Sequence, residues 1–140
     1  MKPWIVCALV SMVFAGFTSV IAKLGLTGIS GDLGLAVRTM FVCVFVLGTT
    51  AFTVPSRQWL TLTPTNGWWL GLSAVTTSVS WIFYYRALKD GEVGTVALID
   101  KGSIVVAVVL AAILFKEPVT WRTVVGGCLV LTGVYVIARK

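Results

Sequence analysis

Five long apolar segments, separated by short polar breaks, constrain this chain more than any other feature of its sequence. Each has room for the roughly 20 apolar residues that cross a hydrocarbon layer about 30 Å thick. Lipid offers the backbone no hydrogen-bond partners, so a spanning segment must be a helix or a strand of a closed barrel. The strict alternation of a membrane strand is missing here. We therefore expect transmembrane helices at residues 4–23, 33–54, 67–88, 93–115 and 121–138.

Composition supports a chain that lies almost wholly within the membrane. Hydrophobic residues make up 58% of its 140 residues, and charged residues make up 11%. That charged share is about half of what a typical globular domain contains, so most of the chain has no wet surface to cover. The sequence predicts an all-α integral membrane protein formed by one domain over residues 1–140.

Several classes of function lack the residues that they need. Histidine is absent, and the three cysteines all lie within expected spans, where they suit helix packing better than a metal site or disulfides. No phosphate-binding loop or nucleophile elbow occurs, so we expect no enzyme, no cofactor and no metal. The 11 basic residues are spread over both ends of the spans, whereas nucleic acid binding needs a clustered, solvated basic face.

The basic residues give no clear orientation in the membrane. Five spans place the two termini on opposite sides. When Lys23 and Arg38 are counted as lying inside helix ends, four basic residues flank the spans on each side. The positive-inside rule then favours neither orientation. We therefore expect dual topology, with copies inserted both ways up.

Two charged residues, Asp100 and Lys101, interrupt the apolar segment 93–115. A charge at bilayer mid-depth costs roughly 2.5–3.5 kcal/mol on insertion scales, so such residues mark a pathway, a binding site or an ion pair. Neighbours on a helix point about 100° apart, so we expect these two to need separate partners. Lys23 and Arg38 lie in the same half of the membrane. An Arg38–Asp100 ion pair is the structural alternative.

The expected helix at 67–88 carries hydroxyl groups along one face. Ser73, Thr77, Ser80 and Tyr84 follow a spacing of four, three and four, and Trp81 lies deeper than the other tryptophans. Such a face either packs against another helix or lines a cavity, and both interpretations stay open. The candidate substrate-binding or coupling residues are Asp100, Lys101, Arg38, Lys23, Ser80, Trp81 and Tyr84.

Short motifs along the chain resemble one membrane family. In order they are residues 22–26 (AKLGL), 35–38 (LAVR), 84–88 (YYRAL), 99–101 (IDK), 115–118 (FKEP) and 126–134 (GGCLVLTGV). Together they resemble an EamA-type domain of the drug/metabolite transporter superfamily, in its single-domain five-helix branch. Larger members resemble two such domains fused in inverted orientation, so the resemblance implies an antiparallel homodimer with a 5+5 inverted-repeat-like bundle. Four-helix multidrug exporters of the superfamily use a first-helix glutamate, which the first span here lacks.

The residues and the resemblance together predict a secondary transporter or exporter that works by alternating access. Lys23, Arg38 and Lys101 outnumber Asp100, which favours an anionic or zwitterionic metabolite, such as an amino-acid-like compound. Two alternatives stay open. One is a non-transporting accessory or assembly subunit whose buried charges are structural, and the other is a flippase of a lipid-linked headgroup. The expected partners are a small-molecule substrate, the bilayer and a second copy, in a prokaryotic inner membrane.

Overall fold

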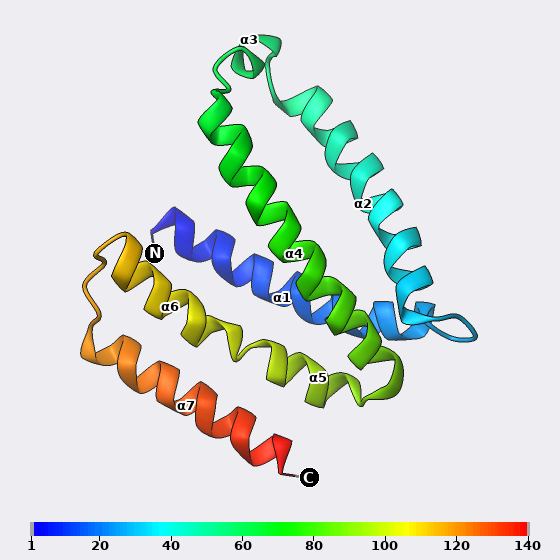
Figure 1. The fold of residues 1–140 in the computed structure, drawn as a ribbon, viewed down its shortest axis with the longest axis vertical. Coiled ribbons are helices and arrows are strands. Elements are labelled where there is room, and N and C mark those ends of the chain that lie inside the picture. The colour runs from blue at the N-terminus through cyan, green and yellow to red at the C-terminus, as the bar shows by residue number, and fades with distance from the viewer. Residues whose placement is uncertain (1, 140) are drawn as a thin grey trace. The chain divides into compact units, whose positions relative to one another are not determined.

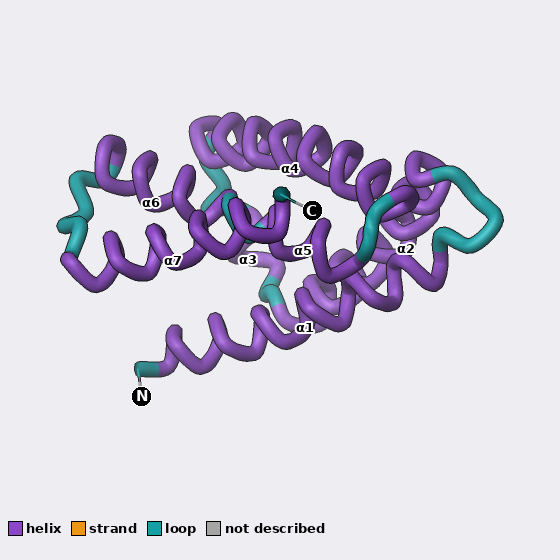
Figure 2. The backbone as a smooth tube through the Cα atoms, turned by 90° about the horizontal axis from the view of Figure 1, so that it is seen from below, coloured by secondary structure: helices purple, strands orange, loops and turns teal. Residues whose placement is uncertain are grey.

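The computed structural model describes residues 2–139, and every regular element among them is a helix. Loops are confined to short connections between helices (Figure 2). In chain order the helices are α1 (Pro3–Gly25), α2 (Gly31–Thr53), α3 (Ser56–Trp59), α4 (Pro64–Asp90), α5 (Val93–Asp100), α6 (Ser103–Leu114) and α7 (Trp121–Ala138). This architecture confirms the all-α prediction.

Four stretches are both long and apolar enough to cross a membrane. They are α1, α2, the α5–α6 stretch Val93–Leu114, and α7. At most 6% of the most apolar window in each stretch is buried in protein. Large side chains such as Phe14 and Phe45 are about two-thirds exposed, at 67% and 69%. Apolar surface of this extent is unfavourable in water and suits contact with lipid.

The remaining predicted span, 67–88, is a helix, and its crossing of the membrane stays a prediction. α4 contains 27 residues, which at 1.5 Å per residue gives about 40 Å of helix, more than a bilayer core requires. Its hydroxyl side chains and charged C-terminal turn make it more polar than the other four stretches. Thr76, Thr77 and Ser78 donate hydrogen bonds to carbonyls three or four residues earlier, so their hydroxyls are satisfied within the helix.

Residue contacts divide the chain into two units, which we describe separately. Unit 1 comprises Met1–Ile21 and Gly91–Lys140, and unit 2 comprises Ala22–Asp90. The boundary falls within α1, so only the last turn of that helix belongs to unit 2.

In unit 1, α5 and α6 both contact α7. The segment expected as one helix over 93–115 is divided, because α5 ends at Asp100 and α6 begins at Ser103 (Figure 1). At the junction the Gly102 amide donates to the Ile99 carbonyl at 2.9 Å, three residues back rather than four. This tighter pattern is typical of helix ends and functional hinges. The segment therefore remains one candidate span, but it is not one uninterrupted helix.

In unit 2, α2 and α4 run antiparallel and contact each other (Figure 1). They approach closely where α2 begins and α4 ends. A Cβ atom added at Gly31 would lie 2.8 Å from the backbone oxygen of Tyr85, so only glycine fits without moving a helix. The buried apolar residues, Leu26, Tyr85 and Leu88, all lie around this approach.

The turn from α1 into α2 explains how this approach is reached. Gly28 has a φ of +77°, a left-handed conformation that glycine adopts without steric cost. Ser30 then caps α2, because its hydroxyl accepts a hydrogen bond from the Leu33 amide at 3.2 Å. The local sequence therefore fixes both the reversal of the chain and the first residue of α2.

Candidate functional site

Two lysines tie the end of α1 to the end of α4 in unit 2. Lys23 Nζ donates to the carbonyl oxygens of Leu88 at 2.6 Å and Lys89 at 2.8 Å. Lys89 Nζ donates in return to the carbonyl oxygen of Leu26 at 2.9 Å. The last carbonyls of a helix lack partners within the helix and carry the negative end of its dipole. The structure thus places Lys23, a predicted substrate or coupling residue, in a helix-capping position.

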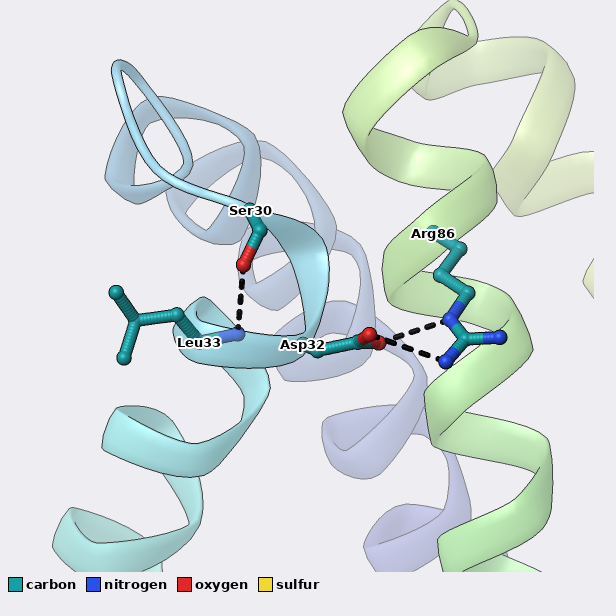
Figure 3. A network of polar contacts seen from close by, with 4 residues as sticks. All are labelled: Ser30, Asp32, Leu33 and Arg86. Atoms are coloured by element: carbon teal, nitrogen blue, oxygen red, sulfur yellow. Dashed lines mark hydrogen bonds and ion pairs between the residues drawn. The ribbon is translucent and has the colours of Figure 1, made fainter.

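A bidentate ion pair joins α2 to α4 near the same end of unit 2 (Figure 3). Arg86 Nε lies 2.8 Å from Asp32 Oδ1, and Arg86 Nη2 lies 3.0 Å from Asp32 Oδ2. Asp32 is in the first turn of α2, where the helix dipole favours an acidic residue. Both side chains are more than half exposed, so the pair neutralises two charges and adds little stability. Neither residue was among the predicted site residues, although the position of Asp32 just after the helix cap was an available signal.

Arg38 lies about 9 Å further along α2 than Asp32, at 1.5 Å per residue. Its Cζ atom is 4.4 Å from the ring centroid of Trp81 and 5.8 Å from the ring centroid of Tyr85. Both distances are within the range of a cation–π interaction. Among residues 22–90, all of which the structure describes, no carboxylate forms an ion pair with Arg38. The structure therefore brings two of the predicted residues, Arg38 and Trp81, into direct contact.

Two polar atoms around this contact are buried without a hydrogen-bond partner among the described residues. They are Nη1 of Arg38 and the hydroxyl oxygen of Tyr85. Tyr85 as a whole is only 3% exposed. An unpaired buried donor costs about 1–3 kcal/mol, so native proteins retain few of them. We call Arg38, Trp81 and Tyr85 together the Arg38–Tyr85 site. Its two unpaired donors are suited to a hydrogen-bond acceptor that comes from outside unit 2.

The other two residues predicted on α4 lie beside this site. The ring of Tyr84 packs edge-on against that of Tyr85, with centroids 6.2 Å apart. Ser80 precedes Trp81, and its side chain is exposed. Sequence analysis missed Tyr85, because the hydroxyl spacing passes through Tyr84. The adjacent tyrosines were the signal, but nothing in the sequence distinguishes one from the other.

In unit 1, Asp100 and Lys101 contact each other at the break between α5 and α6. Lys101 Nζ lies 3.3 Å from Asp100 Oδ2. The expectation that these neighbours cannot neutralise each other is wrong, because α5 ends at Asp100 and the long lysine side chain reaches back to it. Both side chains are partly exposed, with 51% for Lys101 and 36% for Asp100. Either side chain can therefore contact another group in place of its present partner.

Unit 1 also contains a cavity of about 330 Å³ between α6 and α7. Its lining is almost entirely apolar and includes Val105, Val109, Gly127 and Leu131. A polar solute needs several convergent polar groups, so this cavity suits a hydrocarbon chain better. Among residues 2–139, no three His, Cys, Asp or Glu side chains gather in a way that could hold a metal ion.

Comparisons with known proteins relate nearly the whole chain to membrane transporters. The sequence model of the EamA-like transporter family matches residues 2–139. A protein from a Sinorhizobium species, named "Uncharacterized transporter in cobO 3'region", is 31% identical to this chain over 145 aligned residues. The alignment covers 98% of this chain and 97% of that relative. No solved structure matches the chain.

Proposed function

Because this chain belongs to the EamA-like transporter family, we propose that it is a secondary transporter or exporter of a small anionic or zwitterionic metabolite. An amino-acid-like compound is the kind of solute that fits. Family membership and the apolar helices identify an integral, multi-pass membrane protein that is a transporter and not an enzyme. Its sequence carries no phosphate-binding loop. A solute or ion gradient would therefore drive alternating access.

The unpaired guanidinium nitrogen of Arg38 is the observation that carries the substrate class. A charged residue in a membrane-spanning helix is costly unless it has a partner or a function. Arg38 has no carboxylate partner in unit 2, and its Nη1 atom is buried without an acceptor. A substrate carboxylate would supply both the missing negative charge and the missing acceptor. This supports an anion or a zwitterion over a cation.

We assign coupling to Asp100 and Lys101, which lie at the helix break within a candidate span. The Asp100 carboxylate can exchange its contact with Lys101 for a proton or a bound ion. Bends and breaks in spanning helices are common where transporters bind their coupling ions. We assign Lys23 a structural role at the junction of α1 and α4. Ser80 and Tyr84 are assigned to the surroundings of the bound substrate, beside Trp81.

The proposed working unit is an antiparallel homodimer of this single domain, with α4 as the fifth span of each copy. Balanced basic residues on the two sides of the spans support insertion in both orientations. Inverted repeats around a central site are a general architecture of secondary transporters, and a second inverted copy would provide the other half. A prokaryotic inner membrane is the location that we propose.

An accessory or assembly subunit is the second candidate function, because several charges fasten helices together. Lys23 and Lys89 bind backbone carbonyls, and Arg86 binds Asp32. Such contacts are what a non-transporting scaffold would need. Arg38 separates the two candidates, because its buried Nη1 donor without an acceptor lowers the stability of the protein, and a scaffold has no use for such a donor. A flippase of a lipid-linked headgroup would also use an anion site. Uptake of soluble amino acids or small carboxylates distinguishes a metabolite transporter from such a flippase.

Uptake into proteoliposomes by the full-length protein tests the proposal. Radiolabelled amino acids and small carboxylates should enter faster than into protein-free vesicles. Arg38→Lys keeps the charge but loses the planar group that stacks on Trp81, so uptake should fall at least about tenfold, as for one charged hydrogen bond. Arg57→Lys, in the exposed helix α3, is the matched control and should transport normally. Displacement of the solute by lipophilic cations, but not by carboxylates, would refute an anion transporter.

A further inference from the structure

We infer that the Arg38–Tyr85 site binds one singly charged carboxylate, with the Tyr85 hydroxyl as its second donor and the residue that determines specificity. This inference rests on the proposed function and narrows its substrate class. It concerns Tyr85, a residue that the hydroxyl pattern of α4 did not single out.

The placement of Tyr85 is unusually fixed for a side chain with an unpaired hydroxyl. Its backbone lies against Gly31, where even a methyl group would lie 2.8 Å from the backbone carbonyl oxygen of Tyr85. Its ring lies 5.8 Å from the Arg38 Cζ atom, and the residue is 3% exposed. Both unpaired donors thus belong to side chains that contact each other. A phenol hydroxyl and a guanidinium N–H can donate to the two oxygens of one carboxylate.

The charges around the site favour a monoanion over a dianion such as phosphate. Arg86 is neutralised by Asp32. Lys23 and Lys89 donate to carbonyls at helix ends, where the dipole carries compensating negative charge. Asp90, the other carboxylate of unit 2, is exposed as the last residue of α4 and forms no ion pair with Arg38. Arg38 therefore offers the site one positive charge that no carboxylate of unit 2 contacts, and the Tyr85 hydroxyl is neutral. A dianion would keep one charge without a partner in surroundings of low dielectric constant, which is strongly unfavourable.

Calorimetric titration of the full-length protein in nanodiscs tests this inference. The probes are propionate as a monocarboxylate, inorganic phosphate at a pH where it is mainly a dianion, and methylammonium as a cation. Propionate should bind more tightly than phosphate, and methylammonium should not bind. Tyr85→Phe should weaken propionate binding about tenfold or more, which corresponds to one hydrogen bond to a charged group. Tyr135→Phe, which alters an exposed tyrosine of α7, should bind propionate as the wild type does.

A stability measurement separates a binding role of Tyr85 from a purely structural one. Removal of an unpaired buried hydroxyl should raise the thermal unfolding temperature of the unliganded protein, while propionate binding falls. The inference would be overturned if Tyr85→Phe bound propionate with unchanged affinity, or if the wild type bound phosphate and propionate equally. Neither result would contradict the proposed anion transporter. Failure of both anions to bind the wild type would overturn the inference together with the proposed function.

Discussion

Replacement of Lys23 by methionine would show how much the reciprocal lysine caps hold the ends of α1 and α4 together. Methionine keeps much of the side-chain length but removes the ammonium group that donates at 2.6 and 2.8 Å. A hydrogen bond involving a charged group contributes about 1.5–3 kcal/mol. One ammonium group makes both bonds, so we count each at the low end of this range. We therefore expect the free energy of unfolding to fall by about 3 kcal/mol. Lys89→Met removes one bond of 2.9 Å and should cost about half as much.

Equilibrium unfolding in mixed micelles, with SDS as the denaturant and circular dichroism as the signal, measures this difference. Lys116→Met is the control, because Lys116 belongs to unit 1, in the connection between α6 and α7, and is exposed. The double variant at Lys23 and Lys89 should lose less than the sum of the single losses, since both lysines serve one junction. If Lys23→Met unfolds at the same SDS fraction as Lys116→Met, the caps contribute nothing measurable and the reasoning is refuted.

Three further predictions concern the helix contact, coupling and topology. Gly31→Ala should destabilise the protein by about 1–3 kcal/mol through overpacking against Tyr85, as measured by the same SDS unfolding experiment. Gly48→Ala is the control and should be tolerated, because a methyl group there meets open space in the same helix. Asp100→Asn should remove the pH dependence of uptake while folded protein is still recovered, and a wild-type pH profile would exclude Asp100 from coupling. Reporters fused after Lys140 should be active both inside and outside the cytoplasm, and added lysines there should shift the ratio toward one orientation. Activity of a single reporter would contradict dual topology.

The sequence alone determined the helical class and most helix positions. Lipid leaves the backbone only a few ways to satisfy its hydrogen bonds, so long apolar segments dictate helices almost regardless of their detailed sequence. The breaks between the apolar segments were also readable from their polar residues. The structure adds that Gly28 forms the left-handed turn and that Ser30 caps the next helix. The same apolar pattern did not predict the helix break after Asp100. A change from four-residue to three-residue hydrogen bonding leaves the apolar pattern of the segment unaltered.

Only the tertiary structure decided which charged side chains meet. Helical periodicity places residues on a face, but it does not give the rotation and depth of one helix against another. Lys23 and Arg38 therefore looked equivalent in the sequence, whereas the structure bonds Lys23 to carbonyls and stacks Arg38 on Trp81. Tyr84 and Tyr85 differ by about 100° on α4, and the close approach at Gly31 decided which of them is buried beside Arg38.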